Sequence, residues 1–184
     1  NRVNEVEAKS LVAHLIQLLK QDESIGVVAF SEAQLNCILT AIPSPLMGLI
    51  EERQEQNSLF FKTIENVQGE ECDKLLISLG YAKNEEGKLL LNFGPLNRKS
   101  GRRRLNVLLT RAKKKIDFFT SISSEELILS QNDSLNLLRL FLQQIENKNA
   151  VNPLLFPFGL NAEVSAEGNK NLVHFKQIFG QGLD

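Results

Sequence analysis

The sequence has few cysteines and histidines and contains no long hydrophobic run. Cys37, Cys72, His14 and His174 are too scattered for any common metal-ligand spacing, which argues against zinc sites and disulfide scaffolds. No apolar run approaches the ~20 residues of a transmembrane helix, and no signal-peptide pattern is present. We therefore expect a soluble cytoplasmic protein with reduced thiols, no resident metal ion and no membrane contact.

The length and the composition favour one domain with a tail. A chain of 184 residues that is 42% hydrophobic can bury one substantial core. After residue 147 the composition shifts towards Asn, Pro and Gly, so we expect a domain over residues 1–147, and over 148–184 a tail or the start of an appended element. The sequence contains no internal repeat, and its tail has no cluster of carboxylates with a lysine that would indicate a nuclease.

Positive charge is concentrated in one segment of a chain whose net charge is −1. Residues 98–115 hold nine basic residues and no acidic one, which leaves 12 of the 21 basic residues against all 22 acidic ones elsewhere. Such a distribution produces a focused positive field rather than a generally basic surface. Two interpretations stay open, an anion-binding site and a solvated basic face.

Apolar periodicity predicts alternating helices and strands. Short, almost wholly apolar runs such as residues 25–30 are typical of buried parallel strands, whereas residues 4–20 have helical spacing. The pattern predicts an α/β domain with a mostly parallel sheet and helices on both faces. The predicted helices are 4–20, one beginning at Glu32, 44–56, one ending near Ala112, 133–147 and a short one at 170–179; the predicted strands are 25–30, 59–63, 75–79, 116–121 and an extended segment at 88–93.

The arginine-rich helix is the most informative of these elements. Its apolar positions Leu105, Leu108, Leu109 and Ala112 recur at helical spacing, and Arg104 and Arg111 are seven residues, about two turns, apart on one flank. Arginines in the first turn oppose the helix macrodipole, which prefers anions there. We expect an anion nearby, with phosphate as the first candidate.

A second polar segment, residues 63–73, follows a predicted strand and carries a hydroxyl, an amide, a glycine and several carboxylates. Ligands of open α/β sheets gather at loops that follow the carboxyl ends of strands, so we expect a binding site here. Taken alone, Gln68 and Gly69 could form only a turn, and Glu71 could be a turn residue.

Three segments together resemble the second RecA-like domain of superfamily 1 helicases, most closely the branch of the nonsense-mediated-decay helicases and their bacterial relatives. Residues 63–73 are similar to motif V of that family, residues 103–112 to motif VI, and residues 25–30, with Glu32 and Gln34, to motif IV. Residues 29–31 depart from the usual Thr-Pro-Tyr of motif IV. The resemblance covers about residues 3–122.

The resemblance implies a RecA-like fold and a role for each matching residue. Arg111 would be an arginine finger that stabilises the transition state of phosphoryl transfer on ATP bound by a partner domain. The alternative for Arg111 is a surface salt bridge. The other implied site residues are Gln68, Gly69, Glu71 and Arg104 at the nucleotide, and Thr63, Arg102 and Arg103 at the nucleic acid.

The sequence lacks the Gly-x-x-x-x-Gly-Lys-Ser/Thr phosphate loop and an acidic magnesium motif. We therefore expect this chain alone to be inactive and to form the C-terminal half of a motor. A first RecA-like domain upstream of Asn1 would then make most of the contacts to ATP and Mg²⁺. The expected partners are that domain and single-stranded nucleic acid, DNA rather than RNA. The alternative is a RecA-like module that binds nucleic acid or protein without an ATP cycle.

Overall fold

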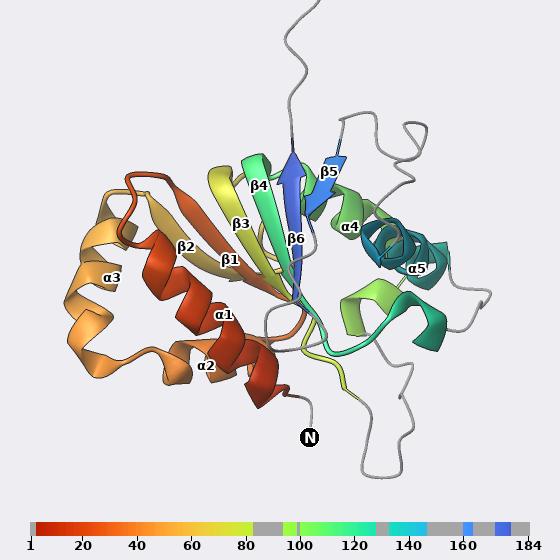
Figure 1. Ribbon diagram of the computed structural model, residues 1–184, viewed down its shortest axis with the longest axis horizontal. Helices are drawn as coiled ribbons and strands as arrows, with labels where there is room; N and C mark the ends of the chain where they lie inside the picture. The colour runs from red at the N-terminus through yellow and green to blue at the C-terminus, as the bar shows by residue number, and fades with distance from the viewer. Residues whose placement is uncertain are drawn as a thin grey trace, which may run out of the picture.

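A computed structural model describes residues 3–82, 94–98, 100–127, 133–146, 160–163 and 172–177. One six-stranded sheet runs through the molecule in the order β2-β1-β3-β4-β6-β5 (Figure 1). The strands β1 to β4 are parallel to one another. Strand β6 is antiparallel to β4, and β5 is antiparallel to β6. The strands are β1 (Ile25–Ala29), β2 (Leu59–Thr63), β3 (Cys72–Ser78), β4 (Ala112–Phe119), β5 (Leu160–Glu163) and β6 (Leu172–Gln177).

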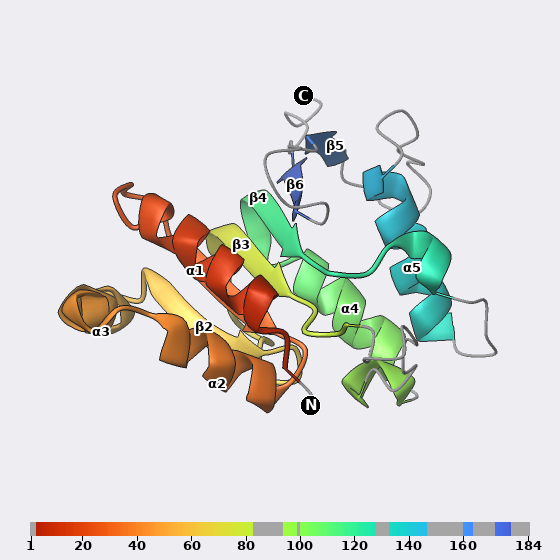
Figure 2. The same cartoon turned by 60° about the horizontal axis from the view of Figure 1, so that its bottom comes forward.

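Helices cover both faces of the sheet, with α1 to α3 on one face and α4 and α5 on the other (Figures 1 and 2). Each face has its own hydrophobic core, and buried residues of β1 and β3 contribute to both cores. This architecture confirms the predicted α/β class and is consistent with a RecA-like domain. The helices are α1 (Glu5–Leu18), α2 (Glu32–Ala41), η1 (Ser44–Leu46), α3 (Met47–Glu55), η2 (Gly94–Asn97), α4 (Gly101–Leu109), η3 (Ser124–Glu126) and α5 (Asp133–Glu146).

Local capping explains where the first helices begin. The side chain of Asn4 caps α1, because its Oδ1 accepts a hydrogen bond from the backbone N–H of Glu7 at 3.1 Å. Ser31 caps α2 in the same way, accepting from the N–H of Gln34 at 3.2 Å. Among the residues the structure describes, no single helix is long and apolar enough to cross a membrane; α2 and the η1–α3 segment reach that length together, but they bend by 94°.

The arginine-rich helix is shorter than predicted. It ends at Leu109, Thr110 and Arg111 form a turn, and Ala112 begins β4 instead of completing the apolar stripe of the helix. Ala112 is buried in β4 and would also be buried on the apolar stripe of a longer helix. Four apolar positions at helical spacing therefore do not distinguish a helix from a strand at this residue. Its pairing with Cys72 of β3 places it in the strand. The prediction that Arg104 and Arg111 share one helix flank is therefore wrong.

The last described segments extend the sheet. Strand β6 pairs with β4 in antiparallel orientation, and β5 pairs with β6. The short helix predicted over residues 170–179 is therefore wrong, because 172–177 form a strand. Strand β3 begins three residues earlier than predicted, at Cys72, with an irregularity in its pairing before Lys74. The extended segment predicted over 88–93 lies outside the described residues.

Gly26 in β1 has no room for a side chain. A Cβ atom there would lie 2.3 Å from the ring of Phe60 in β2 and 2.9 Å from the sulfur of Cys72 in β3. Both distances are below any real Cβ contact, and the three strands are neighbours in the sheet. The absence of a side chain at Gly26 thus lets Phe60 and Cys72 fill one volume over the middle strand.

A buried polar network joins the start of α1 to the carboxyl ends of β3 and β4. The carboxylate of Glu7, which is 4% exposed, accepts hydrogen bonds from Ser78 Oγ (2.9 Å), Gly80 N (2.7 Å), Ser121 N (2.9 Å) and Asn4 Nδ2 (2.9 Å). Burial raises the pKa of Glu7 from its usual 4.5 to about 7, although these donors oppose the shift.

The raised pKa predicts that stability falls as the pH rises. The folded protein holds the proton of Glu7 up to about pH 7, whereas the unfolded chain releases it near pH 4.5, so folding takes up a proton between these values. This contribution is complete below pH 4.5 and is lost as the pH passes 7. Each unit of pKa difference corresponds to about 1.4 kcal/mol, so the free energy of unfolding should fall by about 2–3 kcal/mol between pH 5 and pH 8.

Denaturant unfolding of the wild type and Glu7→Gln at pH 5 and pH 8 measures this effect. We expect the stability difference between the two proteins to change with pH. Glu5→Gln is the matched control, because Glu5 is an exposed carboxylate on the same helix, paired with Lys9 at 3.5 Å. An equal difference between wild type and Glu7→Gln at the two pH values would contradict the assignment.

Candidate functional site

The two polar segments singled out in the sequence lie side by side on one face of the sheet. The loop of residues 64–71 starts at the carboxyl end of β2 and finishes at the amino end of β3. Helix α4 runs antiparallel to the strands β3 and β4, because it follows the carboxyl end of β3 and leads into the amino end of β4. Loop and helix therefore meet twice, once at each end of the strands.

Arg111 lies at the amino end of the strands, and three hydrogen bonds hold its guanidinium group. Nε donates to Val107 O at 2.9 Å, Nη1 to Glu70 O at 3.1 Å and Nη2 to Thr110 Oγ1 at 3.1 Å. Two acceptors are at the end of α4 and one is in the loop. Arginine has five N–H donors, so two remain without a partner among the described residues. No carboxylate pairs with Arg111 in that part of the chain.

The predicted nucleotide residues of the loop are close to Arg111 in space. Gln68 and Gly69 are exposed, and Gly69 has φ +91°, a conformation that favours glycine and turns the chain just before Glu70. Glu71 is exposed and pairs with Lys113 at 3.1 Å. The structure thus brings Gln68, Gly69 and Glu71 to the same end of α4 as Arg111.

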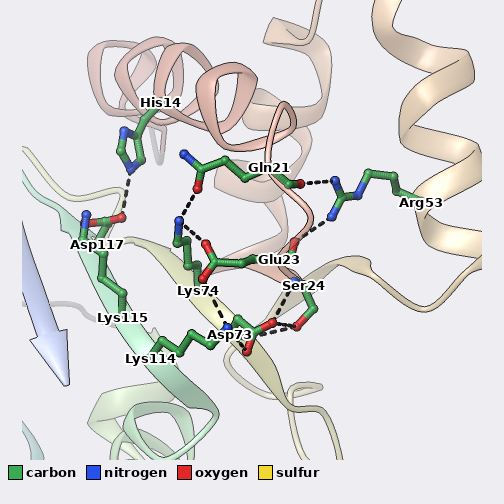
Figure 3. Close-up of polar contacts among 10 residues, drawn as sticks. All are labelled: His14, Gln21, Glu23, Ser24, Arg53, Asp73, Lys74, Lys114, Lys115 and Asp117. Atoms are coloured by element: carbon green, nitrogen blue, oxygen red, sulfur yellow. Dashed lines mark hydrogen bonds and ion pairs between the residues drawn. The ribbon is translucent and has the colours of Figure 1, made fainter. Parts of the chain in front are cut away.

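Asp73, the last residue of the motif-V-like segment, makes contacts that hold the fold together rather than facing a ligand site (Figure 3). Its carboxylate accepts hydrogen bonds from the backbone and hydroxyl of Ser24 at 3.0 and 3.1 Å and pairs with Lys114 at 3.2 Å. Partial burial raises the pKa of Asp73, but the hydrogen bonds from Ser24 and the ion pair with Lys114 outweigh it, so the net shift is downwards. Asp73 therefore ties the amino ends of β1, β3 and β4 together.

Further ion pairs at this end neutralise the lysines of the basic segment. Lys114 also pairs with Glu23 at 3.2 Å, and Lys115 pairs with buried Asp117 at 2.8 Å. Lys74 pairs with Glu23, and the hydrogen bond from this lysine lowers the pKa of that carboxyl (Figure 3). The lysines from 113 to 115 thus face carboxylates, as expected for a structural edge rather than a ligand site.

The other end of α4 has the opposite character. Arg102 and Arg103 are exposed in its first turn, and neither has an acidic partner among the described residues. Arg104 is partly buried, donates to Pro95 O at 3.3 Å and lies 3.5 Å from Glu65. Arg98 donates to the same carboxylate at 2.9 Å. The positive field predicted from the sequence is therefore concentrated at the carboxyl ends of the strands.

The structure divides the predicted site residues into two groups. Arg111 with Gln68, Gly69 and Glu71 forms one group at the amino end; Arg102, Arg103 and Thr63 are at the carboxyl end. Arg104, predicted beside the nucleotide, lies in the second group, and Thr63 is only 4% exposed. The rule that ligands gather at the carboxyl ends did not anticipate the first group. Sequence reasoning also missed the pairing of Glu65, because its partners lie more than thirty residues away.

Comparison with known proteins places these residues in a family. The chain is 37% identical over 136 residues to the "Uncharacterized ATP-dependent helicase MG140" of Mycoplasma genitalium, and 37% identical over 143 residues to its homolog in Mycoplasma pneumoniae. These matches cover 68% and 72% of this chain but only 12% of each relative. A solved structure titled as the plantazolicin methyltransferase BpumL in complex with SAH aligns at a TM-score of 0.41 with 12% identity, over 95% of this chain and 83% of that one.

The AAA domain family matches residues 1–121, which contain both groups of site residues up to Arg111. This region includes β1 to β4 and all the helices from α1 to α4. The chain therefore belongs to the AAA domain family and is related in sequence to mycoplasma proteins named as ATP-dependent helicases.

Proposed function

We propose that this chain is the second motor domain of an ATP-dependent helicase or translocase that acts on single-stranded nucleic acid, with DNA as the preferred strand. The sequence similarity to mycoplasma helicases supports the helicase class. The chain spans about one eighth of those relatives, which leaves room for a first RecA-like domain that carries the phosphate loop. ATP with Mg²⁺ would be bound mainly by that other domain.

The geometry of Arg111 is the observation that carries this proposal. A guanidinium group used as an arginine finger must be oriented before the phosphate arrives, so that little reorganisation is needed during the reaction. Here three of its N–H groups are bonded to the loop and to the end of α4, and two stay available for an anion. An arginine kept only for a surface salt bridge would face a carboxylate instead.

In the proposed reaction the residues of the amino end act on a nucleotide held against them. Arg111 donates to the phosphate oxygens on which negative charge develops, and so lowers the barrier to phosphoryl transfer. Gln68 and the backbone of Gly69 lie beside the phosphates, and Glu71 accepts a hydrogen bond from the ribose. Magnesium supplies charge neutralisation at the phosphates when the nucleotide is bound.

The carboxyl end is proposed to hold the nucleic acid. The exposed guanidinium groups of Arg102 and Arg103 contact strand phosphates. Thr63, at the end of β2, is 4% exposed, so the arginines and not its hydroxyl provide the contacts. Phosphate contacts of this kind position a strand without reading its sequence. Because the nucleotide group and the strand group lie at opposite ends of α4, both ligands can be bound at once.

Replacing Arg111 should abolish ATP hydrolysis. In the complete polypeptide that carries this chain, Arg111→Ala should lower strand-stimulated ATPase activity at least ~100-fold while ATP still binds, because no guanidinium group then stabilises the transition state. Lys20→Ala is the control, since Lys20 is an exposed cation that donates to Gln17 one turn away in the same helical segment. Equal activity of wild type and Arg111→Ala would make Arg111 structural. A wild type that is inactive with every strand would favour the non-catalytic module.

Replacing the exposed arginines should weaken strand binding by this chain. The double variant Arg102→Gln/Arg103→Gln should reduce the affinity for a labelled oligothymidylate, measured by fluorescence anisotropy over a salt series. The slope of log affinity against log salt should fall by about 0.7 for each phosphate that the variant no longer neutralises. Lys9→Gln removes an exposed cation from α1 on the other face and should leave both values unchanged. An unchanged slope in the double variant would overturn the proposed strand surface.

A further inference from the structure

The carboxylate of Glu65 lies between two arginines at the strand end of the molecule. Glu65 follows the last residue of β2 by two positions, and its Oε1 atom accepts from Arg98 Nη1 at 2.9 Å and lies 3.5 Å from Arg104 Nη2. One oxygen thus serves two guanidinium groups that come from different parts of the chain. Guanidinium groups bind carboxylates and phosphates in the same way, through charge-assisted N–H···O bonds.

Glu65 stands out because its surroundings are basic. Residues 98–115 contain no acid, and in the described ranges no other acidic side chain pairs with Arg98 or Arg104. Arg102 and Arg103 are exposed in the same first turn of α4. The lysines at the other end of the basic segment have several acidic partners, so their neutralisation does not depend on a single carboxylate.

The contact is accessible to solvent and is therefore easy to replace. The side chains of Arg98, Glu65 and Arg104 are 65%, 36% and 26% exposed. Ion pairs with this exposure stabilise a fold weakly, and water and salt compete with them. A structural bridge essential to the fold would be expected at a buried position, as for Asp117, which is 1% exposed.

We propose that Glu65 is an internal competitor for strand binding, whose carboxylate occupies the position of a nucleic-acid phosphate between Arg98 and Arg104. The inference rests on the proposed function, because it adds a regulated phosphate contact to the same strand surface. A strand phosphate that displaces Glu65 gains both arginines, and the carboxylate turns towards solvent. Because the ion pairs of Glu65 with Arg98 and Arg104 must first be broken, this exchange lowers the affinity for every strand that contacts the two arginines.

The test compares charge removal at Glu65 with the same change elsewhere. Glu65→Gln keeps the size of the side chain and should raise the affinity of this chain for a labelled oligothymidylate about three- to tenfold at low salt. The salt slope should steepen by about 0.7, because one more phosphate contact becomes available without competition. Glu52→Gln is the matched control, since Glu52 is exposed on α3 and accepts a hydrogen bond from Gln56 at the end of the same helix.

A double variant tests whether the gain passes through the arginine pair. In an Arg104→Gln background, Glu65→Gln should give no more than the small general gain seen with Glu52→Gln, since one of the two receiving guanidinium groups is missing. Circular dichroism checks that each variant is folded. A gain that persists without Arg104 overturns the competitor role.

The remaining outcomes separate this inference from the proposed function. Equal gains from Glu65→Gln and Glu52→Gln would mean that only net charge matters, and a lower affinity in Glu65→Gln would mean that Glu65 orients the arginines; either result overturns the competitor role. If wild type binds the strand and binds it more weakly in Arg102→Gln/Arg103→Gln while Glu65→Gln gains nothing, the proposed function stands and this inference fails. If no folded variant binds any strand, both fail.

Discussion

The connection between β2 and β3 constrains the rest of this structure. The two strands are parallel and lie on either side of β1, so residues 64–71 must cross a strand and return to the opposite end of the sheet. Parallel crossovers generally need a dozen or more residues and a helix. Here the ends are roughly 20 Å apart along the strands, and the segment reaches roughly 30 Å when fully extended. The loop lies directly on the sheet, where it buries Ile64 and Val67, and it takes up its remaining length in two turns, in which Asn66 N–H donates to Thr63 O and Glu70 N–H donates to Val67 O.

This short crossover determines what α4 contacts. The helix packs on the same face as the loop and runs along it, so each end of the helix meets one end of the loop. The contact at the amino end is Arg111 with Glu70, and the contact at the carboxyl end is Arg104 with Glu65. The charges follow the same division, with paired lysines at one end and exposed arginines at the other.

Local signals in the sequence predicted much of the fold. The start of α2 at Glu32 follows from the cap at Ser31, and β1 from five consecutive apolar residues, because both depend on neighbours in the chain. The end of α4 could not be predicted, since Ala112 fits a helix stripe and a buried strand equally well, and only pairing with Cys72 decides. The motif resemblance pointed to Arg111 and the loop as candidate site residues. Their place at the amino ends of the strands depends on the crossover, and the partners of Glu65 depend on packing between distant segments.

The packing around Gly26 has a consequence for how the family can vary. The ring of Phe60 and the sulfur of Cys72 share the space that a side chain at position 26 would fill. A larger residue at any one of the three positions can be accepted only if another becomes smaller, so mutations there are not independent of one another. Three positions on three adjacent strands should therefore covary as one unit during evolution, even though they are far apart in sequence. Correlated changes at these three positions could therefore identify related chains even where motifs V and VI have changed.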